Sequence, residues 1–308
     1  MTEQPPGEHP DGAPGQVHQL AERRTAARRA RDYAAADELR DKIAELGWLI
    51  TDTATGYALA PAAGDAAGGG AVGGSLATVG LLVEGWPDDL RECVGALLQF
   101  APAGVVISGL DVGNRDGAGD VLDALASEHT GRIEVRHVAS DAGWSAGRNA
   151  LLHADRAPVH VIMETSTILT GDAISPLLTA LAADGVVAAG WRGADPDPDL
   201  RGFHDAGPGP VTALLGYLLA VRAEAAAAAG GLPPKALFYR NADLEFSLRL
   251  GHFGRLVVPD EPLPVRQARH RGYHDSDPDY RERESRRNYR RVLDLLRARA
   301  GGETASGG

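Results

Sequence analysis

The chain has 308 residues, of which 44% are hydrophobic, and its formal net charge at pH 7 is −11. This composition is typical of a soluble globular protein, the acidic balance argues against general nucleic-acid binding, and no apolar run approaches the ~20 residues that a membrane-spanning helix needs. Cys93 is the single cysteine, which excludes an internal disulfide and a cysteine-built zinc site. Its helical spacing with Leu90, Val94 and Leu97 predicts a packed core thiol.

The N-terminal segment begins with a Pro/Gly-rich leader, residues 1–16, which lacks the apolar stretch of a signal peptide. We therefore expect this leader to be disordered and the protein to be cytoplasmic. An Ala-rich, helix-forming stretch follows, in which Asp32 suits the N-cap of a second helix and Gly47 its C-terminal stop. Two short strand-like runs around a Thr/Gly turn come next, so residues 17–60 are predicted to form a helical hairpin with a short β-hairpin. The apolar stripe of the second helix consists of Leu39, Ile43 and Leu46.

The segment "RARDYAAADELRDKIAELGWLITDTATGY", residues 29–57, resembles the C-terminal tail of cysteinyl-tRNA synthetases. In that tail, an Ala/Asp-rich helix with "AD-x-LRD-x-I" precedes a Gly, a short strand and a Thr/Gly turn. None of the catalytic or zinc-binding parts of the synthetase is present, so the resemblance does not imply aminoacylation. The arginines of residues 17–48 suggest contact with RNA or a partner, whereas the acids in the same span favour a solvated face of balanced charge.

A Gly/Ala-rich stretch, residues 61–75, has no means of burying a core and is predicted to be a flexible linker. After it, strand-like runs alternate with helical ones, which is typical of a mostly parallel sheet covered by helices. The fold class is therefore α/β. We expect this domain to occupy residues 76–299 and to be followed by a disordered tail, residues 300–308.

Polar residues follow the first three predicted strands of this domain. Glu84 comes after the first strand, and "DVGNRDG" places Asp111 and Asp116 after the second. Acids at the carboxyl ends of strands can accept hydrogen bonds from a ribose or a base. "DAGWSAGRN" then opens a helix with Arg148 and Asn149, a natural cradle for phosphate. These residues are our candidates for nucleotide binding.

Two later motifs complete the pattern. The apolar run "APVHVIMETS" ends in Glu164 and Ser166, and "NADLEFSLRLGHFG" carries Asp243 at a helix start. The order of the motifs resembles that of family-2 glycosyltransferases, which have the GT-A fold. There, "METS" takes the position of the D-x-D metal motif and Asp243 that of the catalytic base. The chain departs from the family at three positions, with Asp141 for Asn, Ser166 for Asp and Ala242 for Glu.

The resemblance implies an inverting transfer of a sugar, such as a hexose, from a nucleotide diphosphate-sugar to an acceptor hydroxyl. Asp243 would take the hydroxyl proton, although an aspartate at a helix start is also a common N-cap. Mg²⁺ or Mn²⁺ would neutralise the leaving diphosphate, with Glu164 and Ser166 as ligands. His270, or His274 as a second candidate, follows the last strand and would be a further ligand.

Two alternatives stay open. The substitutions at the motif positions are consistent with a catalytically degenerate GT-A-like protein that binds a nucleotide or a glycan. The N-terminal module alternatively makes this an RNA-binding or partner-binding protein. Between Arg266 and Arg299 there are about eleven arginines against about six acids, so the last predicted helix could also contact an anionic membrane surface, nucleic acid or an acidic partner.

Overall fold

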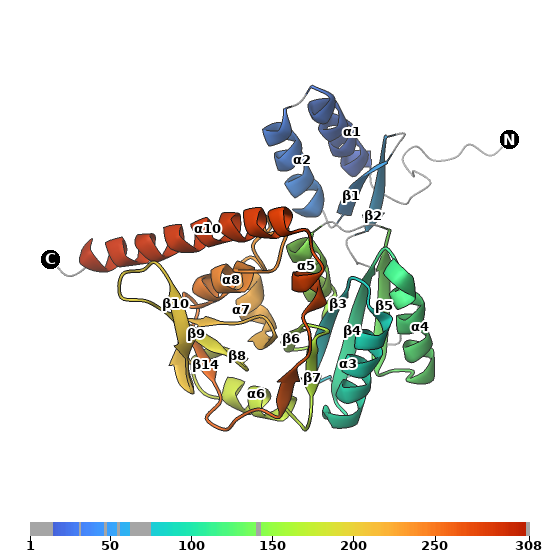
Figure 1. Ribbon diagram of the computed structural model, residues 1–308. Coiled ribbons are helices and arrows are strands. Elements are labelled where there is room, and N and C mark those ends of the chain that lie inside the picture. The colour runs from blue at the N-terminus through green and yellow to red at the C-terminus, as the bar shows by residue number, and fades with distance from the viewer. Residues whose placement is uncertain are drawn as a thin grey trace. The chain divides into compact units, whose positions relative to one another are not determined.

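The computed structural model (Figure 1) describes residues 15–30, 32–45, 48–53, 56–61, 75–139 and 143–305. The chain forms two compact units, Met1–Gly70 and Ala71–Gly308, called unit 1 and unit 2 below. Most of the predicted linker, and with it Gly47, Leu46 and Asp141, lies outside the described residues.

Unit 1 is a helical hairpin followed by a β-hairpin. The Asp32 carboxylate accepts the Ala35 N–H at 3.1 Å, which caps the second helix at its N-terminus. The two strands are antiparallel, with Trp48 opposite Pro61. A small core forms where both hairpins meet, from Val17, Ala21, Ile43 and Leu59. The elements are α1 (Gly15–Arg29), α2 (Tyr33–Glu45), β1 (Trp48–Thr53) and β2 (Gly56–Pro61).

Unit 2 is built on a sheet whose eight strands, within the described residues, follow the order β11-β14-β8-β13-β6-β3-β4-β5. β6, β3, β4 and β5 are parallel, and β14 is parallel to β8, whereas β13 runs antiparallel between β6 and β8. The sheet is therefore mostly parallel. Its strands are β3 (Ala77–Val83), β4 (Val105–Val112), β5 (Ile133–Val138), β6 (Val159–Met163), β8 (Val186–Gly190), β11 (Gly209–Val211), β13 (Leu218–Arg222) and β14 (Arg255–Val258).

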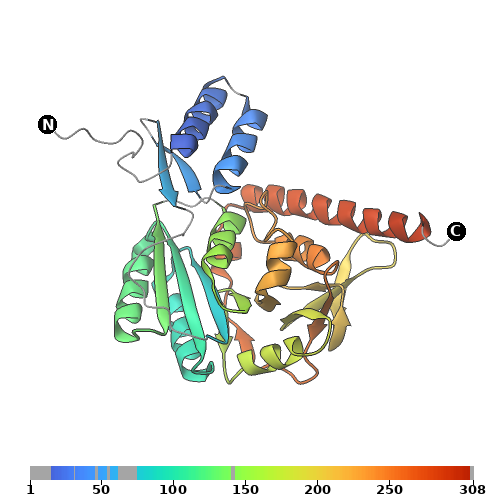
Figure 2. The same ribbon diagram turned by 180° about the vertical axis from the view of Figure 1, so that it is seen from behind.

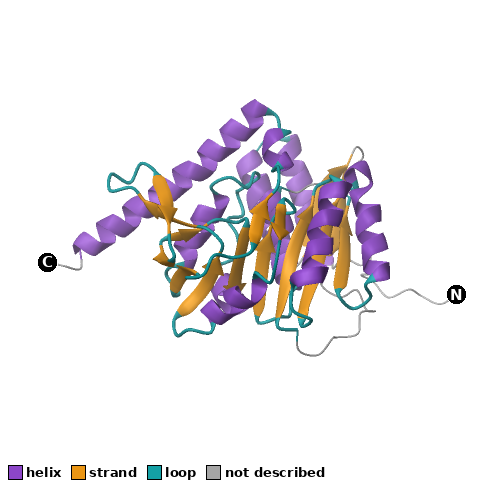
Figure 3. Ribbon diagram, turned by 60° about the horizontal axis from the view of Figure 1, so that its bottom comes forward, coloured by secondary structure: helices purple, strands orange, loops and turns teal. Residues whose placement is uncertain are grey.

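Helices cover both faces of this sheet, as Figures 2 and 3 show. Apolar side chains of β3 point alternately to the two faces of the sheet, so both faces need a covering layer. Leu81 packs into one apolar cluster and Leu82 into the other. The first cluster includes α3 (Pro87–Phe100), α4 (Ala118–Glu128) and α6 (Ile174–Leu181), and the second includes α5 (Trp144–Ala154), α7 (Ala223–Ala228) and α8 (Ala242–Leu250). The result is a three-layer α/β/α unit.

The last helix, α10 (Pro278–Ala305), packs its apolar side on α8 through Val292 and Leu296. It continues through Ala305, so residues 300–305 are helical and not part of a disordered tail. A helix that tertiary packing has already formed gains one hydrogen bond for each residue added, which offsets the low propensity of the Gly pair at 301 and 302. Residues 306–308 lie outside the described range.

Two smaller ladders complete unit 2. β15 (Val265–Gln267) pairs with β7 (Thr167–Leu169) so that Gln267 lies opposite Thr167. The Ala268 N–H then donates to the Ser166 carbonyl oxygen at 2.7 Å, which brings the segment after β15 beside the end of β6. The other ladder has the order β10-β9-β12, and the remaining elements are β9 (Gly193–Pro196), β10 (Phe203–Ala206), β12 (Ala213–Leu214), the 3₁₀ turn η1 (Arg115–Gly117) and α9 (Arg271–His274).

Candidate active site

The predicted site residues lie along one edge of the main sheet. β3, β4, β6, β8 and β14 all end at this edge, and the antiparallel β13 begins there. Glu84 follows β3, Asp111 ends β4 and Glu164 follows β6, while Tyr217 directly precedes β13. Carboxyl ends of parallel strands are where open α/β sheets bind ligands. The topology therefore gathers residues that are far apart in the chain.

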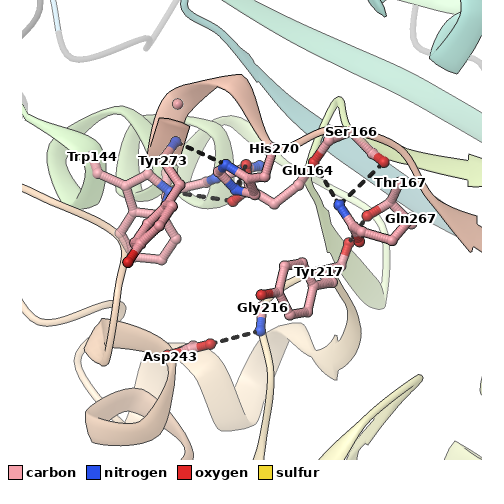
Figure 4. Close-up of polar contacts among 12 residues, drawn as sticks. Trp144, Glu164, Ser166, Thr167, Gly216, Tyr217, Asp243, Gln267, His270 and Tyr273 are labelled. Carbon is pink, nitrogen blue, oxygen red and sulfur yellow. Dashed lines mark hydrogen bonds and ion pairs between the residues drawn. The ribbon is translucent and has the colours of Figure 1, made fainter. Parts of the chain in front are cut away.

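A cavity of about 170 Å³ opens at this edge, and both Asp243 and Glu164 line it (Figure 4). We call it the catalytic cavity. Much of its wall is aromatic, a surface against which a sugar ring can pack. Its lining consists of Trp144, Glu164, Leu215, Gly216, Tyr217, Tyr239, Arg240, Asn241, Asp243 and Leu244.

Asp243 lies in the first turn of α8. Its carboxylate accepts the Gly216 N–H at 3.0 Å and the Leu244 N–H at 2.9 Å. Burial raises the pKa of the Asp243 carboxyl to about 6, and the two backbone hydrogen bonds offset part of this rise. An acid with a pKa just below neutrality is mostly ionised at pH 7 and can still take up a proton, which suits a general base. Asp243 therefore has the ionisation expected of the predicted base.

Glu164 uses its two carboxylate oxygens differently. Oε1 accepts from Arg148 Nη2 at 3.0 Å and from Trp144 Nε1 at 3.4 Å. Oε2 faces His270 Nε2 at 3.9 Å. The Arg148 side chain is 0% exposed and also donates to the Gly80 carbonyl oxygen at 2.8 Å. Arg148, which the sequence led us to expect on the diphosphate, is thus enclosed and holds Glu164 in place.

His270 caps α9 and stacks on the Tyr239 ring, with ring centroids 4.4 Å apart. Its Nδ1 accepts the Tyr273 N–H at 3.2 Å, and its Nε2 is buried with no hydrogen-bond partner among the described residues. The same Tyr273 N–H also donates to the His270 carbonyl oxygen at 3.1 Å, so Nδ1 can give up this hydrogen bond and carry the ring proton when Nε2 acts as a ligand. Nε2 and Glu164 Oε2 are 3.9 Å apart, farther than a hydrogen bond, so the two atoms are candidates to hold one divalent ion together.

Mg²⁺ or Mn²⁺ fits this gap. Such ions are commonly held by one or two protein side chains together with the phosphates of the substrate. Glu164 Oε2 and His270 Nε2 would supply the protein ligands. Ser166 fits less well, because its Oγ accepts from Gln267 Nε2 at 2.8 Å. No cluster of three or more His, Cys, Asp or Glu suited to a metal occurs in the part of the chain that the structure describes.

Solved structures with a similar fold are glycosyltransferases. Unit 2 resembles GalNAc-T7, solved with UDP, GalNAc and Mn²⁺, with a TM-score of 0.59 and 16% identity over 71% of this chain and 48% of that one. It also resembles the mannosyltransferase PcManGT from Pyrobaculum calidifontis, solved with GDP-Man and Mn²⁺, with a TM-score of 0.51 and 16% identity over 76% of each chain. Unit 2 has a GT-A glycosyltransferase fold.

The N-terminal resemblance is confirmed as well. Residues 10–56 match the family model of the cysteinyl-tRNA ligase anticodon binding domain. The cysteine–tRNA ligase of Opitutus terrae is 51% identical over 49 residues, and that of Rubrobacter xylanophilus is 45% identical over 51 residues. These matches cover 16% and 17% of this chain and 11% of each ligase. The likeness to the ligases is therefore confined to one small domain.

Three residues that the sequence predicts to bind the nucleotide form hydrogen bonds within the protein instead. Asp111 is 2% exposed, and both its oxygens accept the Asn114 N–H, at 3.1 and 3.0 Å. Asp116 accepts the Trp86 N–H at 3.1 Å. Asn149 bonds the Leu232 backbone in both directions, at 3.1 and 2.8 Å. In this conformation these three side chains hold loops and helices together, and their nucleotide contacts stay predictions.

A second, narrow cleft of about 10 Å³ lies beside the catalytic cavity, and Glu164 lines both. Glu84 and Trp86 form one of its sides, and the segment with His270 forms another. The second histidine candidate, His274, contacts the Tyr273 ring and lines neither of these two cavities. Of the two histidines, only His270 is brought to Glu164.

Sequence reasoning missed three features of the site. Trp144 and Tyr239 wall the catalytic cavity, and His137 bonds Asp111 at 3.1 Å, a contact that raises the pKa of this histidine. Trp144 stands inside the quoted "DAGWSAGRN" motif and could have been found there. The pairing of His137 with Asp111 joins neighbouring strands and has no local signal.

Among the described helices, none is both long and apolar enough to cross a bilayer.

Proposed function

We propose that the GT-A unit transfers a hexosyl group from a nucleotide diphosphate-sugar to an acceptor hydroxyl, with inversion at the anomeric carbon. The observation that carries this proposal is the pair of carboxylates on one aromatic cavity, one of them with a pKa of about 6. The GT-A fold and the nucleotide-sugars named for the two structural neighbours support the donor class.

In this reaction Asp243 accepts the proton of the acceptor hydroxyl. The hydroxyl oxygen forms a bond to the anomeric carbon while the bond from that carbon to the diphosphate oxygen breaks on the opposite side. Gly216 and Leu244 donate to the Asp243 carboxylate and fix its direction. Because the pKa is about 6, most molecules carry the ionised base at pH 7.

The negative charge of the departing nucleoside diphosphate requires a counter-charge. A divalent ion held by Glu164 Oε2 and His270 Nε2 would supply it. Arg148 has a positioning role here, since it occupies Oε1 and leaves Oε2 toward His270. The Tyr239 ring, stacked on the imidazole, restricts the orientation of that histidine.

The test is Asp243→Asn in the full chain, with UDP-, GDP- and TDP-sugars as donors. Release of the nucleoside diphosphate should fall by at least ~100-fold while donor affinity is unchanged, because a general base acts in the transition state. Asp184→Asn is the matched control, since Asp184 is exposed and precedes β8 at the opposite edge of the sheet. An unchanged rate would reject Asp243 as the base. A folded protein that binds no donor would instead favour the degenerate scaffold.

A second candidate function belongs to unit 1. Its match to an anticodon binding domain supports RNA binding by this module. The full chain should then bind bulk tRNA, and removal of residues 1–60 should abolish the binding. Affinity should fall steeply between about 50 and 200 mM salt. Arg23→Gln and Arg29→Gln should weaken binding, whereas Arg156→Gln in unit 2 should not. Equal affinity of the truncated chain would contradict this assignment.

A further inference from the structure

The last helix, α10, carries a strongly basic segment in an otherwise acidic chain. Residues 281–299 contain eight arginines and three acids, whereas the whole chain has a net charge of −11. The helix runs along the outside of unit 2 (Figures 1 and 2). Four of its exposed arginines are spaced three or four residues apart, so they project from one face of the helix. We call these residues, Arg283, Arg286, Arg287 and Arg290, the arginine stripe.

Buried polar contacts anchor the opposite face of α10 beside the catalytic cavity. Asn288 is 0% exposed, and its Nδ2 donates to the carbonyl oxygens of Phe238 and Arg240 at 2.7 and 2.8 Å. The Asn241 side-chain amide donates to the Ser285 carbonyl oxygen at 3.2 Å. Because Arg240 and Asn241 line the catalytic cavity, the basic part of α10 is bonded directly to a wall of that cavity.

The charge of the arginine stripe is only partly neutralised within the protein. Its four arginines have two carboxylate partners among the described residues, Glu282 and Glu284. Arg290 forms no ion pair with a described residue. The pair of Arg286 with Glu282 is exposed, and such pairs contribute little stability, so a phosphate group can replace the carboxylate. The stripe is therefore suited to an anionic partner.

The packing of α10 favours RNA over a membrane as that partner. A helix that lies in a membrane surface inserts its apolar side into the lipid, whereas Val292 and Leu296 of α10 are packed on α8. The guanidinium group binds phosphate through paired hydrogen bonds, and RNA presents a phosphate at every nucleotide. Unit 1, proposed above to bind RNA, also exposes Arg23 and Arg29 on α1. RNA is thus the one ligand class that suits both units.

The catalytic cavity has the groups that a nucleoside acceptor requires. Every RNA nucleotide within a strand offers a 2′-hydroxyl, and RNA-binding sites stack unpaired bases on aromatic side chains. Trp144, Tyr217 and Tyr239 wall the cavity beside Asp243. Arg240, which also lines the cavity, is exposed and forms no ion pair with a described residue, so it is available to a flanking phosphate.

We propose that the acceptor of the transferase is a transfer RNA. This assignment rests on both functions proposed above. Unit 1 holds the anticodon arm, the arginine stripe contacts the phosphate backbone, and one nucleoside hydroxyl enters the catalytic cavity. Its oxygen bonds to the anomeric carbon, its proton passes to Asp243, and the nucleoside diphosphate leaves with the electrons of the broken bond. Because one chain carries both units, an RNA held by unit 1 stays at high local concentration for unit 2.

The test measures transfer of a radiolabelled sugar to RNA by the full chain with Mn²⁺. The donors are UDP-glucose, UDP-galactose, UDP-N-acetylglucosamine, GDP-mannose and TDP-glucose, and the acceptors are bulk tRNA, an unmodified tRNA transcript and 5S ribosomal RNA. At least one donor should label tRNA and leave the ribosomal RNA unlabelled. Nuclease digestion and mass spectrometry should place the sugar in the anticodon arm. Label on the transcript assigns the acceptor to a ribose hydroxyl, and label on bulk tRNA alone assigns it to a modified base.

Variants of the two basic surfaces test how the RNA is held. Arg286→Gln together with Arg290→Gln should raise KM for tRNA by at least ~5-fold, and Arg23→Gln with Arg29→Gln should do the same. Each lost phosphate contact should also reduce the slope of log affinity against log salt concentration by about 1. Donor affinity and Tm should not change. Arg156→Gln is the matched control, because Arg156 is exposed and precedes β6 at the opposite edge of the sheet.

The outcomes separate this assignment from the functions on which it rests. If the donor is turned over and tRNA stays unlabelled, the transferase stands and the tRNA acceptor is rejected. If tRNA binds and no donor binds, the transferase fails and the acceptor assignment falls with it. Equal labelling of tRNA and ribosomal RNA, or an unchanged KM in the stripe variants, would also overturn the proposal. So would a stripe that binds vesicles of phosphatidylglycerol and phosphatidylcholine and does not bind tRNA.

Discussion

Charged side chains on the two halves of the sheet edge differ in burial and in pairing. At the end of β6, a pair of opposite charges is buried, Arg148 with Glu164. At the carboxyl ends of β8 and β14, the charged side chains around Trp191 are exposed and form no ion pair with a described residue, as in Glu261 and Arg192. Buried pairs hold a geometry in advance of binding, whereas exposed side chains can change without cost to the fold. The comparison indicates that the charges near Glu164 belong to the core of unit 2, whereas those near Trp191 can change with little effect on its stability.

The largest expected effect comes from breaking the buried pair. Arg148→Met leaves the Glu164 carboxylate without its counter-charge and should lower the free energy of unfolding by about 3–5 kcal/mol. The double variant Arg148→Met with Glu164→Gln should recover much of this loss, because it removes both charges. Urea denaturation of the three proteins checks both statements. A loss below ~1 kcal/mol in the single variant would contradict the statement that Arg148 and Glu164 form a buried, interdependent pair.

Loss of the metal should come next. EDTA should abolish binding of the nucleotide-sugar, and His270→Gln should weaken Mn²⁺-supported binding by roughly 10–100-fold, because it removes one of two protein ligands. Calorimetry with Mn²⁺, Mg²⁺ or EDTA measures this directly. His274→Gln is the matched control and should leave donor affinity unchanged. Equal donor binding with and without EDTA would show that no metal ion takes part in donor binding.

The pH dependence sharpens the role of Asp243. The base must be ionised, and its pKa is about 6, so the rate of nucleoside diphosphate release should fall as pH decreases through about 6. Below that pH the rate should drop about tenfold for each unit, and near pH 7–8 it should be flat with respect to this group. A profile that stays flat down to pH 5 would contradict a base of this pKa.

The smallest effect on the fold is expected at Asp260, near Trp191. Asp260→Asn should change the free energy of unfolding by no more than ~0.5 kcal/mol, since the side chain is exposed and forms no hydrogen bond or ion pair among the described residues. Urea denaturation measures the change. A loss above ~1 kcal/mol would contradict the contrast between the two halves of the edge.

Local patterns predicted the fold and part of the site. Alternating strands and helices indicated the layered unit, and Asp32 marked the start of α2 because an N-cap depends on nearby backbone alone. Asp243 was proposed as the base because its segment resembles the family motif, and this role stays a prediction. The contacts of Arg148 and His270 with Glu164 could not be predicted from local patterns, because the three residues lie on different elements.

Features that depend on tertiary packing were outside the reach of these patterns. The buried state of Arg148 follows from Glu164 across the sheet, and a local pattern shows only an arginine at a helix start. The groove around Trp191 combines this residue with residues 205–208 and 258–263, which become neighbours only when β14 pairs with β8. The helical state of residues 300–305 likewise follows from a long packed helix before them.

The short ladder between β15 and β7 fixes the position of His270 relative to Glu164. It sets Gln267 opposite Thr167, and three residues later His270 faces Glu164. An insertion or deletion between Gln267 and His270 would place an arginine or another neighbour at that position. Length changes in residues 259–264, before the ladder, would leave the alignment intact. Indels among homologues should therefore concentrate in residues 259–264 rather than between Gln267 and His270.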